Sequence, residues 1–269
     1  MIEPLLLTTA RIATFNGQQA LTAATGFFFA RDERLFFATS RHVLMDKPSA
    51  HLPDRVEITM HTSDADLTRI AVQSILLYDQ GKSIWLQGRD SGGEIDVAAI
   101  ELDQSALPAG TVMHAFTPES LLPAGNEVQV GAHLLLPGFP LGFYDTVHYL
   151  PVVRQAIIAS AFGVRFQGQG FFLTDARAHR GSSGAPVAMH DPAIEGDMKY
   201  RLLGIHSSRM DMGTRDRAED ESLGLNTAWY ADILMTLTQR RLAQTPAMAP
   251  SAVPGVVAES IPTVNVAAD

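Results

Sequence analysis

The stretch GFFFARDERLFFATSRHVL, residues 26–44, contains two aromatic-rich runs, GFFFA (26–30) and RLFFATS (34–40). The charged turn Arg31-Asp32-Glu33 joins them, and two such runs around a short polar turn are typical of a β-hairpin. His42 follows the second run almost directly. We therefore expect a hydrophobic hairpin that carries an imidazole just beyond its second strand.

Outward from this hairpin, short runs with the composition of strands recur, with turn residues between them. They lie at 55–62, 69–79, 83–88 and 96–102 in the first half, and at 127–139, 146–162, 169–175, 184–189 and 200–208 in the second. The stretch between the halves holds three prolines and two Ala-Gly pairs, which indicates a connection. Many short strands without alternating helices predict an all-β protein built of barrels or a sandwich.

We expect one helix after the strands, at 229–243, because its apolar residues are roughly helix-spaced. Residues 244–269 are rich in Ala, Pro, Val and Ser and contain no Lys or Arg, which predicts a flexible tail. The predicted organisation is an N-terminal barrel, a C-terminal barrel, a helix and a tail, at 1–120, 121–228, 229–243 and 244–269.

The composition of the chain excludes several classes of protein. Of 269 residues, 46% are hydrophobic and 18% are charged, which is enough apolar material for a core and unlike a disordered polyelectrolyte. The net charge of −9 argues against nucleic-acid binding, because such proteins neutralise phosphates with basic residues. The chain has no cysteine, so it can form neither disulfides nor thiolate zinc sites.

The sequence also lacks the features of a membrane, secreted or metal-dependent protein. No apolar run approaches the roughly 20 residues that cross a bilayer. Glu3 and Pro4 stand where a secretory signal has its basic region, so we expect a cytoplasmic protein without membrane contact. The nine histidines show no His-x-x-x-His spacing on a helix, and we expect neither a metal nor another cofactor.

A second informative string, TDARAHRGSSGAPV at 174–187, sets Ser183 between Gly181 and Gly184. A nucleophilic serine needs backbone N–H groups aimed at the oxygen on which negative charge develops. A glycine two residues before the serine lets two such groups converge, and the glycine after it leaves room for a substrate. The same small residues also suit an ordinary tight turn, so the string alone leaves both interpretations open.

Two further residues supply what a serine nucleophile needs. A hydroxyl is a weak nucleophile near neutral pH and requires a general base, for which His42 is the candidate. Asp96 opens the apolar run DVAAIEL (96–102), where a carboxylate is costly unless it has partners. An imidazole N–H would be such a partner. Taken singly, His42 also fits an ordinary surface or capping residue and Asp96 a strand-start cap.

The order His, Asp, Ser, with each residue beside a strand, resembles the trypsin-like serine endopeptidases. ATSRHVL and DVAAIEL are similar to that family's histidine and aspartate strings. The serine string resembles the HtrA-type branch, with its Thr-Asp-Ala, four variable residues and Gly-x-Ser-Gly-Gly-Pro, and LPGFPLGF (136–143) looks like that branch's turn at the start of the second barrel. The resemblance spans roughly 20–230 and implies two six-stranded antiparallel β-barrels with the active site between them.

The resemblance implies a role for each residue. Ser183 would be the nucleophile, His42 the general base and Asp96 the group that orients the imidazole. The N–H groups of Gly181 and Ser183 would form the oxyanion hole. The expected reaction is cleavage of a protein or peptide substrate through an acyl-enzyme.

Departures from the family pattern bear on activation and specificity. Ser182 stands where trypsin-type zymogens carry an aspartate, so activation by that ion pair is not expected. We also expect no PDZ domain like that of the HtrA-type proteases, because residues 244–269 are too few to form one. Arg177 and Ala178 stand where the family builds its primary specificity pocket. A bulky cationic side chain such as that of Arg177 could block the site, recognise an acidic side chain of the substrate or point to solvent, and these three alternatives stay open.

The expected substrate-binding residues are Arg177, Ala178, His206, Ser207 and Arg209. His206 resembles the histidine with which glutamyl endopeptidases bind glutamate, although Ala178 lacks the hydroxyl that assists it there. Two alternatives to a constitutive protease remain open at this point. One is a catalytically silent peptide-binding or regulatory module, and the other is a protease switched on by a protein partner.

Overall fold

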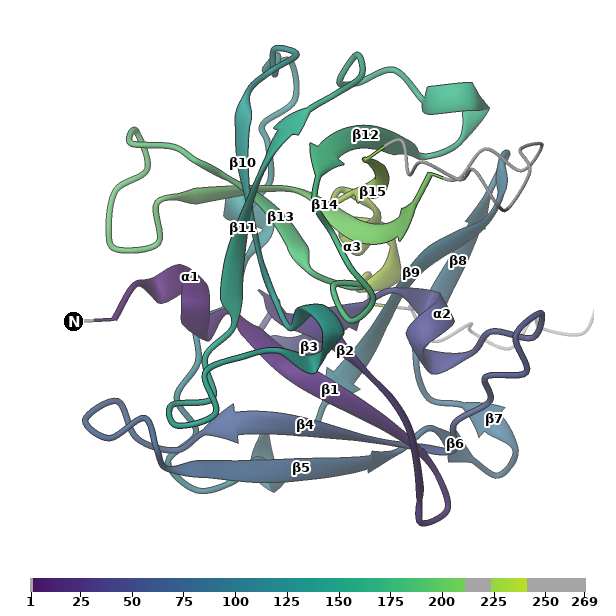
Figure 1. The fold of residues 1–269 in the computed structure, drawn as a ribbon, viewed down its shortest axis with the longest axis vertical. Helices are drawn as coiled ribbons and strands as arrows, with labels where there is room; N and C mark the ends of the chain where they lie inside the picture. The colour runs from purple at the N-terminus through teal and green to yellow at the C-terminus, as the bar shows by residue number, and fades with distance from the viewer. Residues whose placement is uncertain (1, 211–223, 241–269) are drawn as a thin grey trace, which may run out of the picture. The chain divides into compact units, whose positions relative to one another are not determined.

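The computed structural model describes residues 2–210 and 224–240, and the chain up to Gln239 forms one structural unit (Figure 1). Two antiparallel sheets make up most of it. No helix among the described residues is long and apolar enough to cross a membrane. The fold is all-β, as the sequence predicts.

The first sheet has seven strands in the order β5-β4-β1-β2-β3-β9-β8, an open order that ends at β5 and β8. The sequence predicted six strands in a closed barrel. The additional strand is β1, whose Thr and Ala residues form no continuous apolar run. The seven strands are β5 (Ile70–Leu76), β4 (Arg55–His61), β1 (Thr9–Asn16), β2 (Gln19–Arg31), β3 (Arg34–Thr39), β9 (Gly93–Leu102) and β8 (Leu86–Asp90).

The second sheet is a closed barrel in the order β10-β11-β12-β15-β14-β13, which confirms the predicted six-stranded second barrel. The predicted domain boundary at 120/121 falls in the connection between the two sheets. The strands are β10 (His133–Gly138), β11 (Val152–Ile158), β12 (Phe171–Ala176), β15 (Leu225–Tyr230), β14 (Tyr200–Arg209) and β13 (Pro186–His190).

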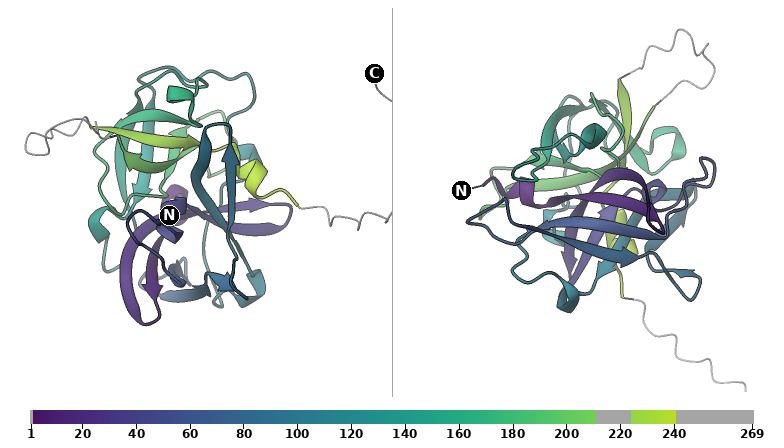
Figure 2. Two further views of the ribbon diagram at one scale, coloured as in Figure 1. Left: turned by 90° about the vertical axis from the view of Figure 1, so that its right-hand side faces the viewer. Right: turned by 60° about the horizontal axis from the view of Figure 1, so that its bottom comes forward.

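The predicted C-terminal helix is shorter than expected and begins later. Helix α3 covers only Ile233–Leu237, and Trp229 belongs to β15, where it pairs with Phe171 of β12 and Ile205 of β14. Sheet pairing on both sides overrides the weak helical spacing of this segment. Figure 2 shows α3 beside β8 and β9 of the first sheet. Residues 211–223, residues 241–243 and the predicted tail at 244–269 lie outside the described residues.

The remaining elements are short. A two-stranded ribbon pairs β6 (Tyr78–Asp79) with β7 (Lys82–Ser83). The α-helices other than α3 are α1 (Pro4–Leu7) and α2 (Arg41–Leu44), and the 3-10 helices are η1 (Gln104–Ala106), η2 (Pro118–Ser120), η3 (Pro140–Gly142) and η4 (Phe166–Gly168).

The aromatic hairpin β2–β3 explains how the two halves pack. Successive side chains of a strand point to opposite faces of the sheet. Phe27 and Phe29 pack in a cluster that also holds Ile205 and Trp229 of the second barrel, whereas Phe28 packs within the first sheet. Three consecutive phenylalanines are therefore all buried, because both faces of this hairpin are covered. The hairpin turn is formed by Asp32 and Glu33, both at positive φ.

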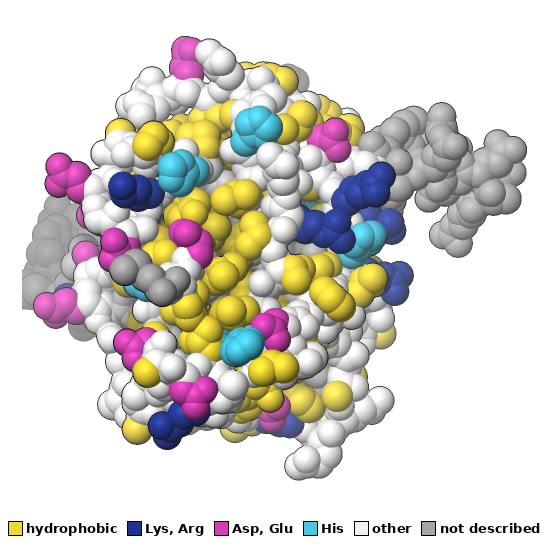
Figure 3. Space-filling model, turned by 60° about the vertical axis from the view of Figure 1, so that its left-hand side comes forward, with side chains coloured by type: hydrophobic (Ala, Val, Ile, Leu, Met, Phe, Trp, Pro, Cys, Tyr) yellow, Lys and Arg dark blue, Asp and Glu magenta, His cyan; other side chains and the backbone are white. Residues whose placement is uncertain are grey.

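Some apolar side chains stay at the surface. Figure 3 shows a band of them on the side that carries α1 in Figure 1, bordered by acidic and histidine side chains. Apolar atoms contribute a large share of every folded protein's surface, so this band alone indicates no partner.

Candidate active site

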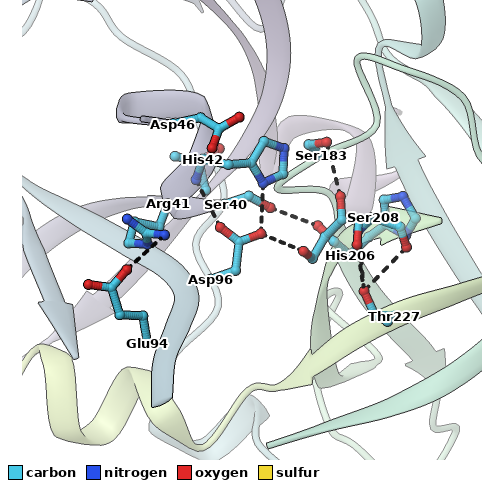
Figure 4. A network of polar contacts seen from close by, with 12 residues as sticks. Ser40, Arg41, His42, Asp46, Glu94, Asp96, Ser183, His206, Ser208 and Thr227 are labelled. Atoms are coloured by element: carbon cyan, nitrogen blue, oxygen red, sulfur yellow. Dashed lines mark hydrogen bonds and ion pairs between the residues drawn. The ribbon is translucent and has the colours of Figure 1, made fainter. Parts of the chain in front are cut away.

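The pairing of β3 with β9 brings His42 and Asp96 together. Thr39 lies opposite Ala98 in this antiparallel ladder, so the residues that follow Thr39 meet those that precede Ala98. His42 lies in α2, and its backbone N–H donates to Asp96 Oδ1 at 2.8 Å. Its ring Nδ1 lies 2.7 Å from Asp96 Oδ2 (Figure 4). Two contacts to one carboxylate fix the orientation of the imidazole.

His42 and Asp96 each shift the pKa of the other in favour of its charged form. Burial would raise the pKa of Asp96, but hydrogen bonds from His42 and Ser207 outweigh it and hold that pKa below its usual range. Burial would lower the pKa of His42, but the hydrogen bond and charge of Asp96, together with the charge of Asp46, raise it. Asp96 therefore stays ionised near neutral pH, and His42 is a stronger base than a free imidazole.

Ser183 lies in the loop between β12 and β13 and lines the same cleft as His42. Figure 4 shows its side chain on the side of the imidazole that faces away from Asp96. Its Oγ donates to the carbonyl oxygen of Ser207 at 3.0 Å. No hydrogen bond joins Ser183 to His42, although the structure describes both residues. The three predicted residues are therefore brought together, with the serine hydroxyl turned toward β14.

The loop before Ser183 presents two backbone donors. Gly181 and Gly184 both have positive φ, at 91° and 85°. The carbonyl of Arg180 accepts from the N–H of Leu141 at 2.5 Å, so the N–H on the other side of that peptide, that of Gly181, points the opposite way. Within the described part of the chain, neither the Gly181 nor the Ser183 N–H has a hydrogen-bond acceptor.

Residues of the first sheet hold this loop in place. The backbone N–H of Thr25 donates to the carbonyl of Ser183 at 3.1 Å. The hydroxyl of Thr25 donates to the carbonyl of Gly181 at 2.7 Å and accepts from the N–H of Phe139 at 3.0 Å. Thr25 was not singled out by the sequence, because a threonine inside a strand carries no signal of such a contact.

The remaining predicted residues differ in their surroundings. Ala178 is buried, whereas Arg177 and Arg209 are exposed. Ser207 is buried, and its hydroxyl donates to Asp96 Oδ2 at 2.5 Å, a contact that the sequence did not predict. Substrate binding by these residues stays a prediction. Ser182, the serine directly before Ser183, is buried and its N–H donates to the carbonyl of His179, in keeping with a structural role.

His206 is only 2% exposed, and its Nδ1 has no hydrogen-bond partner among the described residues. Burial, with a smaller effect from the charge of His42, lowers its pKa to about 4. The ring is therefore neutral at physiological pH and offers no positive charge to an acidic substrate. No cluster of three or more metal-ligating side chains occurs among residues 2–210 and 224–240.

Comparison with known proteins agrees with this geometry. A family model described as a trypsin-like peptidase domain matches residues 24–192. No curated protein matches the chain. The serine endoprotease from Yersinia pestis resembles it with a TM-score of 0.50 and 16% sequence identity, over 86% of this chain and 61% of that one.

A second solved structure, the Rv3671c protease from M. tuberculosis in its active form, has a TM-score of 0.47 and 16% identity, over 87% of this chain and 82% of that one. At such identities the likeness concerns the fold alone. The family match extends over more than half of the chain, including the positions of His42, Asp96 and Ser183. The chain therefore belongs to the family of trypsin-like peptidases, with a serine-protease fold.

Proposed function

We propose that this protein is a serine endopeptidase that cleaves protein or peptide substrates with Ser183, His42 and Asp96. The observation that carries the proposal is the His42–Asp96 pair, in which Nδ1 of His42 lies 2.7 Å from Oδ2 of Asp96. His42 lines a cleft that Ser183 also lines. An imidazole held by a carboxylate beside a serine hydroxyl is the arrangement that activates a hydroxyl as a nucleophile.

In the first step the Ser183 hydroxyl turns from the Ser207 carbonyl toward Nε2 of His42. Nε2 takes the proton while Oγ attacks the carbonyl carbon of the scissile peptide bond. The negative charge that develops on the carbonyl oxygen is stabilised by the N–H groups of Gly181 and Ser183, which have no other acceptor among the described residues.

The tetrahedral intermediate then collapses. The C–N bond breaks, the protonated His42 gives its proton to the leaving amine, and an ester joins the substrate's acyl group to Ser183. A water molecule, deprotonated by His42, attacks this ester. The bond between the acyl carbon and Oγ then breaks, the protonated His42 returns its proton to Oγ of Ser183, and the carboxylic acid product leaves. Asp96 stays ionised throughout and stabilises the imidazolium that forms in each half of the reaction.

The test is a fluorophosphonate probe, which reacts with an activated serine, followed by mapping of the labelled peptide. We expect labelling at Ser183 in the wild type and none in Ser183→Ala. Cleavage of peptides from a denatured proteome should fall by about 10⁴-fold or more in that variant, because the hydroxyl and the base act as a unit.

Ser182→Ala is the matched control, since it removes the neighbouring hydroxyl and should retain labelling. A folded wild-type protein that neither reacts with the probe nor cleaves any peptide would contradict the proposal.

The hydrogen bond from Ser183 to Ser207 favours a second candidate, in which the protease stays silent until a peptide or a partner turns the hydroxyl. Labelling of Ser183 that appears only after a peptide or partner protein is added would support this candidate. Equal labelling rates with and without the addition would exclude it.

A further inference from the structure

The cleft beside Ser183 has a volume of about 580 Å³. One wall is the beginning of β2, and the other combines α2 with the segment that follows it. Gly181 and Ser183 close the cleft at one end. The lining residues are Gln19, Ala20, Leu21, Thr22, Ala23 and Ala24 on the first wall, and His42, Val43, Asp46, Ser49, Ala50 and His51 on the second, with Arg180 beside Gly181.

If the proposed function holds, this cleft lies on the leaving-group side of the scissile bond. His42 must protonate the departing amine, so the part of the substrate that leaves first passes His42. The cleft is lined by His42 and Ser183. It is not lined by β14, which carries the residues His206, Ser207 and Arg209 expected to bind the part of the substrate before the cleaved bond. It therefore receives the residues that follow the cleaved bond.

The cleft contains one carboxylate, that of Asp46. Ser49 Oγ donates to Asp46 Oδ2 at 2.5 Å, which orients the carboxylate without neutralising it. No basic side chain of the described chain pairs with Asp46. The neighbouring Arg41 pairs with Glu94 at 3.1 Å instead, and Lys47 is exposed and does not line the cleft.

Among the described residues, none of the other titratable groups that line the cleft forms an ion pair with Asp46. His51 lies beside Asp46, but its ring Nε2 contacts the carbonyl of Val43 at 2.9 Å. Arg180, next to Gly181, also lines the cleft, and its side chain is exposed and forms no ion pair with Asp46 in the described chain. The charge of Asp46 reaches His42, because it contributes to the raised pKa of that ring, although less than burial and Asp96 do. Figure 4 shows Asp46 on α2's side of the imidazole, away from Ser183.

We propose that Asp46 determines specificity on the leaving-group side, where the cleft takes a lysine or arginine that directly follows the scissile bond. A long basic side chain can lie along the half-buried Leu21 and Ala23 of the cleft wall with its methylenes and place its charged group at the carboxylate. Charge-assisted hydrogen bonds of this kind are stronger than neutral ones. Because the cleft is open to solvent, we expect a preference of about tenfold over a neutral side chain.

The experiment compares two fluorogenic peptides that differ only in the residue after the cleaved bond, lysine in one and norleucine in the other. The parent peptide is the best substrate from profiling of a proteome digest. We expect kcat/KM in the wild type to favour lysine about tenfold, and Asp46→Asn to reduce the ratio to about one. Asp46→Asn also lowers the pKa of His42, but this affects both peptides equally and cancels in the ratio.

Two further variants keep the test independent of folding. Asp64→Asn removes an exposed carboxylate that does not line the cleft, so this variant should keep the wild-type ratio of kcat/KM for the two peptides. Asp46→Lys should reverse the preference, so that a peptide with glutamate after the cleaved bond is cleaved faster than the lysine peptide. A reversed preference cannot result from loss of structure.

The outcomes separate this inference from the proposed function. A wild type that cleaves both peptides equally, or an Asp46→Asn variant that keeps the tenfold ratio, overturns the role of Asp46 and leaves the protease intact. A folded wild type that cleaves nothing and resists the fluorophosphonate probe overturns the proposed function, and the inference with it.

Discussion

The two halves of the molecule contribute to the site in different ways. The first half supplies both His42 and Asp96. Two contacts join these residues, and the register of β3 with β9 brings them together. The second barrel supplies Ser183 on a loop with positive-φ glycines, and residues of the first sheet hold that loop. The proposed base is therefore positioned within one half, whereas the proposed nucleophile and its backbone donors depend on the contact between the halves.

The largest expected effect on stability and activity comes from a side chain added at Gly184, where the two halves of the molecule touch. A Cβ atom on Gly184 would lie 2.2 Å from the carbonyl oxygen of Thr25 and 2.9 Å from Cα of Thr39. Both are backbone atoms that cannot move aside without separating the halves. We expect Gly184→Ala to lower the free energy of unfolding by about 4 kcal/mol and to remove activity, as measured by urea unfolding and peptide cleavage.

Gly17→Ala is the control for this variant, because Gly17 also has positive φ but nothing within 4 Å of the added Cβ. It should cost only the backbone strain, about 1 kcal/mol, with activity retained. Equal losses of stability in the two variants would show that strain alone, and not the contact between the halves, explains the effect.

The second prediction concerns how the stability of the folded protein depends on pH. The two histidines of the site, His206 and His42, affect this dependence in opposite directions. The pKa of His206 falls from 6.5 to about 4 on folding, mainly through burial. Between these values the unfolded chain binds a proton that the folded chain does not, so stability falls as the pH drops from 6.5 toward 4. His42 acts in the opposite sense. Its raised pKa contributes stability at low pH that is lost as the pH rises through the folded value.

We expect His206→Gln to remove about 3 kcal/mol of the stability change between pH 7 and pH 4, whatever its effect on stability at pH 7. The measurement is urea unfolding at half-unit pH steps in the wild type and the variant. Parallel pH curves would mean that the buried ring is not the group that titrates.

The sequence predicted the fold class and the candidate triad because both depend on local strings. The hairpin, the Asp96 strand and the Gly181–Gly184 turn each carry their own signal, and β3–β9 pairing then brings His42 to Asp96. The sequence did not predict β1 or β15. Neither strand has a continuous apolar run, and both are stabilised by neighbours on two sides: β1 by β2 and β4, β15 by β12 and β14.

The contacts that the sequence missed share a physical cause. Ser207 reaches Asp96 and Thr25 reaches Gly181 across 111 and 156 residues of chain. A serine or threonine hydroxyl bonds with whatever the tertiary structure places beside it, so its residue type indicates no particular partner. The acidic Asp46 gave no signal for the same reason, since only the folded cleft shows that it faces the site.

The smallest expected effect tests whether the first sheet positions the nucleophile loop as well as stabilising it. In Thr25→Val the side chain keeps its shape but can neither donate to the carbonyl of Gly181 nor accept from the N–H of Phe139. The loss of two hydrogen bonds should cost about 2 kcal/mol of stability. Because Gly181 carries one of the two donors proposed for the oxyanion, kcat should fall about tenfold or more, with little change in KM. Thr8→Val is the matched control, since the buried Thr8 hydroxyl donates to the carbonyl of Leu5 and contacts the hydroxyl of Thr9, and none of these residues lines the cleft. It should lose comparable stability while kcat stays at the wild-type value. If both variants lower kcat in proportion to their stability, Thr25 is merely structural, and the first sheet positions only the base.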